Sequence, residues 1–221
     1  MKRTNLFILF VIFLIILNSC SSLHQIRFSQ DKLPWKSSGE VLLEDDFSDD
    51  TTGWEIVNNV YELKGYSSEG YLISINHQNG RSISTTGLQF SDINLQVATH
   101  KLTGSNDTYM GIVCRYKDKL NYYRFFVTPD GYAGIVRVVN GESSTLPDDK
   151  MIYSHDVIQD SATNLLEVSC IGNKLSLSIN GKVAISAEDD QLEQGDVGIF
   201  AETGKDGAGS FIFSQFIVTK P

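Results

Sequence analysis

The middle of the chain contains three short apolar or alternating segments that are separated by turn signals. The segments are Tyr109–Tyr116, Tyr122–Val127 and Tyr132–Val139. The second segment is followed by Pro129-Asp130-Gly131 and the third by Asn140-Gly141, and Gly and Asn tolerate the backbone conformations that tight turns require. Three consecutive strands joined by such turns predict a β-meander at the centre of the fold.

The same pattern extends over most of the chain. No segment of helical length outside the leader shows a clean 3.6-residue period. Many short strands at regular spacing, each bounded by Gly, Asn or Asp, are typical of an antiparallel β-sandwich or jelly roll, and 221 residues are enough for one such domain. The sequence therefore predicts an all-β sandwich. The other predicted strands are Glu40–Phe47, Val60–Leu63, Tyr71–Ile75, Arg81–Thr85, Ile93–Lys101, Asn164–Ile171, Lys174–Ile179, Lys182–Ala187, Asp196–Glu202 and Phe211–Thr219.

The N-terminus has the features of an export signal. Lys2 and Arg3 precede an apolar run over residues 6–17, which is long enough for a signal peptide but shorter than the roughly 20 residues of a membrane-spanning helix. The run ends at Leu17-Asn18-Ser19-Cys20, which resembles the lipobox of bacterial lipoproteins. This resemblance implies cleavage before Cys20 and acylation of its side chain. An ordinary secretory leader and an uncleaved helical anchor are the alternatives.

These features predict three parts. Residues 1–19 form a lipoprotein signal peptide, residues 20–39 a lipidated tether rich in Ser, Gln and Lys, and residues 40–221 the β-domain. The protein is accordingly expected to be exported and held at the cell membrane or cell envelope by its lipid.

The three cysteines divide in a way that fits export. If Cys20 carries the lipid, Cys114 and Cys170 remain as an even pair in a compartment that permits disulfides. We predict that these two residues are bridged. Two buried free thiols on unrelated strands are the alternative.

Charge narrows the range of partners. The net charge is −9, and loss of a leader that contains Lys2 and Arg3 would make the mature chain more acidic still. Because phosphate backbones are bound by clustered Lys and Arg, no nucleic-acid partner is expected. The acidic run Glu44–Asp50 is interpreted as a solvated turn; it lacks EF-hand spacing, and a structural calcium ion is the alternative. No other cofactor is expected.

Strand alternation assigns the meander residues to two faces, if five residues link the first two strands and four link the next two. The more apolar face is predicted to be core and the other open. The predicted core face carries Val113, Arg115, Tyr123, Phe125, Val127, Gly134, Val136 and Val138. The predicted open face carries Met110, Ile112, Cys114, Tyr116, Tyr122, Arg124, Phe126, Ile135 and Arg137.

Five of these residues are candidates for ligand binding. Sugars are bound by aromatic faces that stack on C–H surfaces and by planar groups that donate paired hydrogen bonds, a task for which Arg is well suited. The alternative is that the tyrosines cover sheet edges and the arginines pair with surface carboxylates. The candidates are Tyr116, Tyr122, Arg124, Arg137 and, at a strand end, Arg115.

A series of short motifs between residues 40 and 219 resembles a known superfamily. The motifs are Asp46-Phe47-Ser48-Asp49 with Gly53-Trp54, Gly111-Ile112-Val113-Cys114-Arg115-Tyr116, Asn121-Tyr122-Tyr123-Arg124-Phe125, Asp130-Gly131-Tyr132, Ile179-Asn180-Gly181 and Gly195-Asp196-Val197-Gly198-Ile199. Together they resemble the concanavalin A-like lectin/glucanase superfamily, in particular the laminin G-like jelly-roll modules of bacterial surface lipoproteins. The resemblance implies two stacked, curved antiparallel sheets with a concave face that often binds carbohydrate. Relatives include 3-keto-disaccharide hydrolase domains and family 16 glycoside hydrolases.

The sequence contains no catalytic motif that matches these hydrolases. The Glu-x-Asp-x-x-Glu arrangement of the family 16 enzymes is absent from every predicted strand, and Glu167 stands between two apolar residues. We therefore expect a non-catalytic cell-surface lipoprotein with a carbohydrate-binding jelly roll. A hydrolase of the 3-keto-disaccharide type and a structural or protein-interaction module of the envelope are the alternatives.

Overall fold

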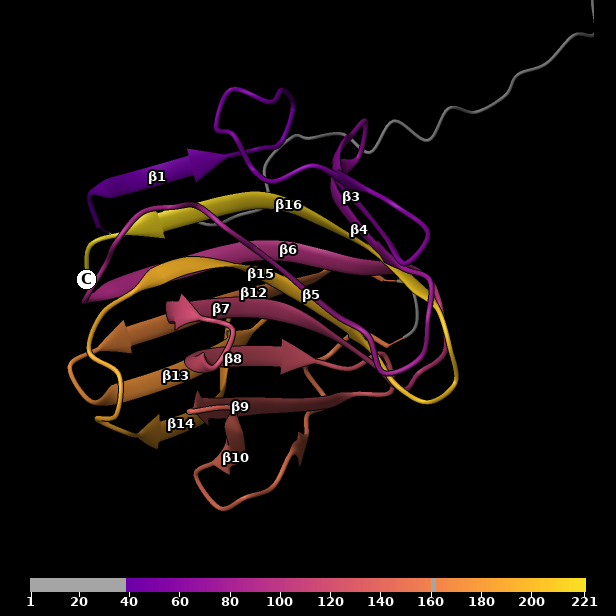
Figure 1. The fold of residues 1–221 in the computed structure, drawn as a ribbon. Helices are drawn as coiled ribbons and strands as arrows, with labels where there is room; N and C mark the ends of the chain where they lie inside the picture. The colour runs from indigo at the N-terminus through magenta and orange to yellow at the C-terminus, as the bar shows by residue number, and fades with distance from the viewer. Residues whose placement is uncertain (1–38, 160–161) are drawn as a thin grey trace, which may run out of the picture. The chain divides into compact units, whose positions relative to one another are not determined.

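The computed structural model describes residues 39–159 and 162–221. The predicted signal peptide, Cys20 and the tether as far as residue 38 lie outside the described residues. Within the described ranges, every regular secondary-structure element is a β-strand, and the strands form two antiparallel sheets (Figure 1). The all-β prediction is confirmed. Between residues 39 and 221, apart from 160–161, no helix is long and apolar enough to cross a membrane.

The larger sheet has nine strands. Its order is β14-β13-β12-β6-β16-β4-β3-β2, and β1 pairs with β16. The strands are β1 (Val41–Asp45), β2 (Val57–Asn58), β3 (Glu62–Ser67), β4 (Gly70–Ile75), β6 (Ile93–Thr103), β12 (Asn164–Ile171), β13 (Lys174–Ile179), β14 (Lys182–Glu188) and β16 (Gly209–Thr219).

The smaller sheet has seven strands and contains the predicted meander. Its order is β10-β9-β8-β7-β15-β5, and β11 pairs with β9. The strands are β5 (Arg81–Thr85), β7 (Thr108–Asp118), β8 (Asn121–Val127), β9 (Tyr132–Val139), β10 (Glu142–Leu146), β11 (Ile152–Tyr153) and β15 (Asp196–Thr203).

Most predicted strands agree with the observed ones. Asn140 and Gly141 have φ values of 53° and 82°, which is the left-handed conformation that a two-residue hairpin turn needs. The prediction was wrong at Val60, which is an exposed residue before β3. It also missed β2, β10 and β11, because β10 is rich in Ser and Thr and β2 and β11 are only two residues long, so none of them shows apolar alternation.

The hydrophobic core lies between the two sheets. In β12, Leu166, Val168 and Cys170 are buried, whereas the intervening residues are partly exposed, as alternation requires. Met110 of β7 and Phe125 of β8 meet them from the seven-stranded sheet. The two sheets are therefore joined by one continuous apolar layer.

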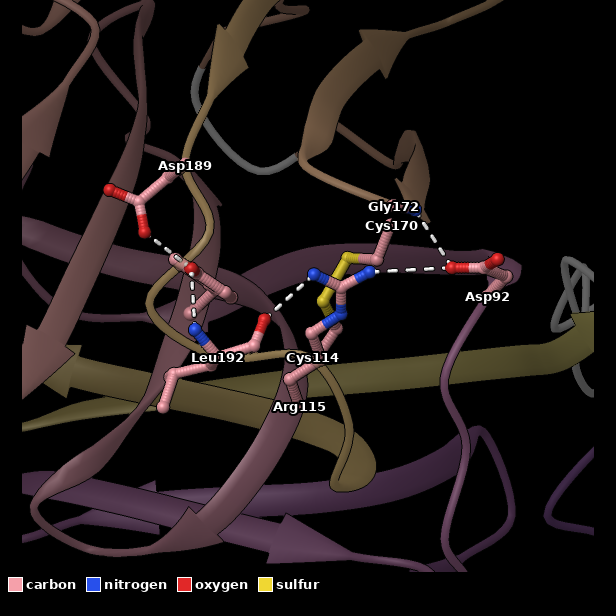
Figure 2. The surroundings of a disulfide bond; sticks show 8 residues. Asp92, Cys114, Arg115, Cys170, Gly172, Asp189 and Leu192 are labelled. Atoms are coloured by element: carbon pink, nitrogen blue, oxygen red, sulfur yellow. Dashed lines mark hydrogen bonds and ion pairs between the residues drawn. A yellow bond between two sulfur atoms is a disulfide. The ribbon is translucent and has the colours of Figure 1, made fainter.

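A disulfide connects the two sheets through this layer. Cys114 of β7 is bonded to Cys170 of β12, as Figure 2 shows. The predicted pairing is confirmed. Because the bridge crosses from one sheet to the other, it ties β7, the first strand of the meander, to β12 of the opposite sheet.

Candidate functional site

The face of the seven-stranded sheet that points away from the nine-stranded sheet is called the outer face here. Residues directly opposite each other in paired strands point to the same side of a sheet. Cys114 is opposite Tyr123, and Tyr123 is opposite Arg137. Since Cys114 lies in the core, Tyr123 and Arg137 point to the core side as well.

The predicted faces were right for β8 and for Tyr116, and wrong for residues 110–114 of β7 and for β9. In β9 the reason is register, because Ala133 rather than Tyr132 lies opposite Val127, and a shift of one residue exchanges the faces of a strand. In β7 the register shifts after Cys114, which lies opposite Tyr123. Four residues predicted to be open lie in the core: Met110, Ile112, Cys114 and Ile135. Three residues predicted to be core lie in a cluster on the outer face: Val113, Val136 and Val138.

Arg115 lies at a β-bulge in β7 and not on the outer face. Its φ is 51°, and the pairing of β7 with β15 shifts by one residue at this point. Its buried guanidinium donates from Nη1 to the Leu192 carbonyl at 2.7 Å, and its Nη2 lies 3.5 Å from Asp92 Oδ1 (Figure 2). Burial lowers the pKa of Arg115. Its observed contacts are structural.

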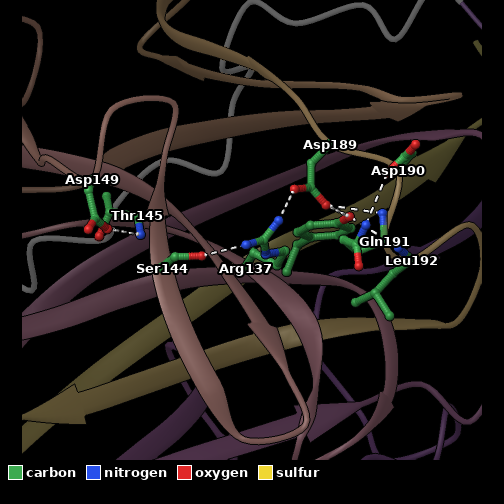
Figure 3. A network of polar contacts seen from close by, with 9 residues as sticks. Arg137, Ser144, Thr145, Asp149, Asp189, Asp190, Gln191 and Leu192 are labelled. Carbon is green, nitrogen blue, oxygen red and sulfur yellow. Dashed lines mark hydrogen bonds and ion pairs between the residues drawn. The ribbon is translucent and has the colours of Figure 1, made fainter.

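Arg137 is also separated from the outer face. Its Nη1 donates to Asp189 Oδ2 at 2.6 Å, and its Nη2 donates to Ser144 Oγ at 3.1 Å (Figure 3). The Tyr123 hydroxyl donates to the other oxygen of Asp189, and burial followed by this hydrogen bond raises the pKa of Tyr123. The backbone N–H of Gln191 donates a hydrogen bond to the same carboxylate. This Asp189 network anchors the segment that follows β14 onto the seven-stranded sheet.

The other three candidates, Tyr116, Tyr122 and Arg124, share the outer face. The rings of Tyr116 and Tyr122 are 5.6 Å apart. Tyr122 is only 1% exposed, so it supports the face rather than offering a ring to a ligand. Arg124 lies over the ring of Phe200, with its guanidinium carbon 5.8 Å from the ring centroid.

Arg124 belongs to an ionic cluster on this face. Glu202 Oε2 accepts hydrogen bonds from Arg124 Nη1 and from Arg81 Nε, the latter at 2.7 Å. Arg81 Nη1 also donates to the Tyr122 hydroxyl at 3.1 Å. Burial acts to lower the pKa of Arg81, but the hydrogen bond and charge of Glu202 outweigh it and raise the pKa. Two cations therefore share one carboxylate.

The sequence interpretation missed Arg81 and Glu202. They are directly opposite each other in β5 and β15 but 121 residues apart in the chain. Each is a single charged residue at the end of a strand, and no local motif marks either one. Only the pairing of the strands brings them together.

A row of side chains runs across the strands of the outer face, at the strand ends where Arg81 and Glu202 lie. Glu202 is opposite Arg81 on one side and Tyr109 on the other, and Tyr132 of β9 is opposite Tyr153 of β11. Thr128, whose backbone N–H donates to the Tyr132 carbonyl at 2.8 Å, continues the row between them. We call this set the rim row. Its members are Arg81, Glu202, Tyr109, Thr128, Tyr132 and Tyr153.

The rim row is the most accessible part of the outer face, although Thr128 within it is buried. Arg81, Tyr132 and Tyr153 are exposed, and Tyr109 and Glu202 are partly exposed. Burial, together with the charges of Asp107 and Glu202, raises the pKa of Tyr109, so its hydroxyl stays a neutral donor at physiological pH. The neighbouring rows are closed by buried side chains, namely Val113, Tyr122, Phe126, Val136, Val138 and Phe200.

The acidic run near the N-terminus of the domain forms turns. Asp45, Asp46 and Asp49 each accept a hydrogen bond from a backbone N–H two residues later, at 2.7–2.9 Å. These bonds are Asx turns. The hydrogen bonds from Ser48 lower the pKa of Asp46. In the described part of the chain, no group of three or more His, Cys, Asp or Glu side chains is placed to hold a metal ion.

The comparison with known proteins identifies the fold. No protein-family model matches the sequence, and no curated protein matches it. Among solved structures, a carbohydrate-binding module, CBM66 from Bacillus subtilis, superposes with a TM-score of 0.63 at 17% identity, covering 85% of this chain and all of that chain. A Bacillus licheniformis β-glucanase superposes with a TM-score of 0.60 at 9% identity, covering 84% and 100%. A B. subtilis protein of unknown function with a galectin-like fold has a TM-score of 0.62 at 10% identity, covering 83% and 97%.

At these identities the likeness establishes the fold. The chain has the concanavalin A-like jelly roll that the sequence motifs predicted.

Proposed function

We propose that this chain is a non-catalytic glycan-binding protein whose jelly roll binds carbohydrate along the rim row. One observation carries the proposal. On an outer face largely closed by buried apolar side chains, the accessible row presents tyrosine rings and the guanidinium group of Arg81. These are the two chemical groups that bind sugar rings and their hydroxyls. A carbohydrate-binding module with the same fold adds support.

The charges in the rim row favour binding over hydrolysis. A retaining glycosidase places two carboxyl groups about 5 to 5.5 Å apart across the scissile bond. The rim row contains one carboxylate, Glu202, and its Oε2 is occupied by two guanidinium groups. A hydrolase of the 3-keto-disaccharide type is therefore the second candidate, and the product analysis below distinguishes the two.

A glycan panel tests the proposal. We expect the purified full-length chain to bind a restricted set of oligosaccharides and to leave them intact on thin-layer analysis. Arg81→Gln should weaken binding. Its matched control is Lys220→Gln, which removes an exposed ion pair to Glu40 beside β1 of the nine-stranded sheet and should not. Cleaved sugar would establish the hydrolase instead, and folded protein that binds no member of the panel would refute glycan binding.

We further propose that the protein is exported and anchored in the cell envelope by a lipid on Cys20. The support is the N-terminal apolar run that ends in Leu17-Asn18-Ser19-Cys20. In a bacterial host, the unmodified chain should incorporate labelled fatty acid and sediment with membranes, whereas Cys20→Ala should do neither. Equal sedimentation of the two proteins without label would refute the anchor.

A further inference from the structure

Three aromatic rings are grouped at the β11 end of the rim row. Tyr132 and Tyr153 are opposite each other in β9 and β11, with ring centroids 5.6 Å apart and ring planes at 79°. His155 follows, with its ring 5.1 Å from that of Tyr153 at 85°. Edge-to-face contacts of this kind are the favoured arrangement of aromatic pairs. We call the three residues the aromatic ladder.

The ladder is exposed but held in place. Tyr132 is 39% exposed and Tyr153 is 46% exposed. The Tyr153 hydroxyl accepts a hydrogen bond from Gln159 Nε2 at 2.8 Å. The Tyr153 ring lies against Gly131, which has a φ of 98° and where a Cβ atom would come within 2.8 Å of the ring. The rings therefore lose little conformational freedom when a ligand stacks on them.

The ladder lies far from Arg81 and Glu202, the two members of the ionic cluster that belong to the rim row. From β15, which carries Glu202, to β11 there are four strand spacings, or about 19 Å across the sheet. A single sugar ring is too small to reach both groups. A ligand that uses the whole rim row has to be a chain of several sugars that runs across the strands.

We propose that the aromatic ladder is a second carbohydrate subsite, where a pyranose ring at one end of an oligosaccharide packs with its flat face on one of the two tyrosine rings and its edge against the other, while the ionic cluster binds hydroxyls nearer the other end. Stacking on tyrosine rings requires no charge on the sugar. This inference rests on the proposed function and makes the ligand class an oligosaccharide rather than a monosaccharide.

Titration calorimetry with sugars of defined length tests the subsite. The probes are the β-1,3-gluco-oligosaccharides and the xylo-oligosaccharides, each from disaccharide to hexasaccharide, added to the full-length chain. For the series that binds, affinity should rise about tenfold or more with length. Tyr132→Ala/Tyr153→Ala should abolish this rise, so that the hexasaccharide binds no more tightly than the disaccharide.

The matched control is Tyr61→Ala. Tyr61 is 66% exposed and its ring contacts that of His77 edge to face at 6.0 Å, but it precedes β3 of the other sheet. This variant should behave as the unmodified chain does. Tyr153→Phe, which keeps the ring, and His155→Ala, which removes one exposed ring, test the subsite even where the double variant does not fold. Tyr153→Phe should retain the length dependence and His155→Ala should reduce it.

The outcomes separate the subsite from the proposed function. If the folded double variant, or His155→Ala in its place, keeps the full length dependence while Arg81→Gln weakens every member of the series, the ladder is not a subsite and glycan binding along the ionic cluster stands. If neither series binds to the unmodified chain at millimolar concentration, the subsite is refuted. If the glycan panel is negative as well, the proposed function fails with it.

Discussion

Arg124 crosses the ring of Phe200 and ends on the carboxylate of Glu202. Its guanidinium carbon lies 5.8 Å from the ring centroid, and its side chain is 12% exposed. A guanidinium over an aromatic face, with one end tied to a carboxylate, is restricted in orientation. The donors of Arg124 are therefore pre-arranged on the outer face. Its backbone lies two rows in from the rim row, and its side chain crosses the row of Phe200 to reach Glu202.

Replacing Arg124 should reduce glycan binding through this arrangement. We expect Arg124→Ala to lower affinity for the best-binding sugar by about tenfold or more, since one charged hydrogen bond contributes about 1.5 to 3 kcal/mol. Arg124→Lys keeps the charge but loses the planar group, and should recover only part of the affinity. Calorimetry measures both. Unchanged affinity in Arg124→Ala would remove this residue from the site.

Loss of the disulfide should destabilise the sandwich. Cys114 and Cys170 are 56 residues apart and lie in different sheets. Closing a loop of this length restricts the unfolded chain, so Cys114→Ala/Cys170→Ala should lower the free energy of unfolding by about 2 to 4 kcal/mol. Urea titration with and without reductant measures the effect. Reductant should shift the midpoint of the unmodified chain and leave that of the variant in place; equal midpoints without reductant would contradict the prediction.

We expect the side chain of Asp189, but not that of Asp190, to contribute to the free energy of unfolding. Its side chain is 7% exposed and accepts hydrogen bonds from Tyr123, Arg137 and the Gln191 backbone (Figure 3). Asp189→Ala leaves these donors without their partner and should cost about 2 kcal/mol or more. Asp190→Ala is the control: Asp190 is exposed, so its loss should change stability by about 0.5 kcal/mol or less. Similar effects of the two changes on urea midpoints would refute the role of the network.

Alkaline pH should destabilise the fold partly through Tyr71. Burial raises the pKa of Tyr71 from 10.0 to about 12, and its hydroxyl is within 3.0 Å of Ser84 Oγ. Above pH 10 the unfolded chain loses this proton first, so it binds fewer protons than the folded chain and stability falls as pH rises. The contribution is fully present below pH 10 and is lost by about pH 12, with a total of about 2 kcal/mol.

Tyr71→Phe isolates this effect. The variant should be less stable at neutral pH, because the Glu55 carbonyl and the Ser84 hydroxyl lose a partner. Its stability should nevertheless fall less steeply between pH 10 and pH 12. The remaining slope belongs to other tyrosines, among them Tyr123, whose pKa is also raised by burial. Urea titrations at stepped pH give both slopes, and identical slopes would show that Tyr71 does not titrate in this range.

Local sequence was sufficient for the architecture of the protein. Alternation and turn residues such as Asn140-Gly141 predicted the central meander, because strand period and turn conformation are local properties. The pairing of Cys114 with Cys170 was predicted by counting cysteines in an exported chain, and the structure confirms it. The fold class and the strands with apolar alternation needed no knowledge of distant contacts, whereas β2, β10 and β11 have no such local pattern.

The tertiary structure alone decided which residues face outward and which of them meet. The side-chain period of a strand is two, so a shift of one residue exchanges its faces. In β9 the shift comes from one additional residue in the link after Val127. In β7 it comes from the bulge at Arg115. These register differences moved Arg137 to the core side. The rim row follows from the order of strands in the sheet, which sets Arg81 beside Glu202 and Tyr132 beside Tyr153. Alternation along a single strand contains no information about that order, because strand neighbours are chosen by packing across the whole chain.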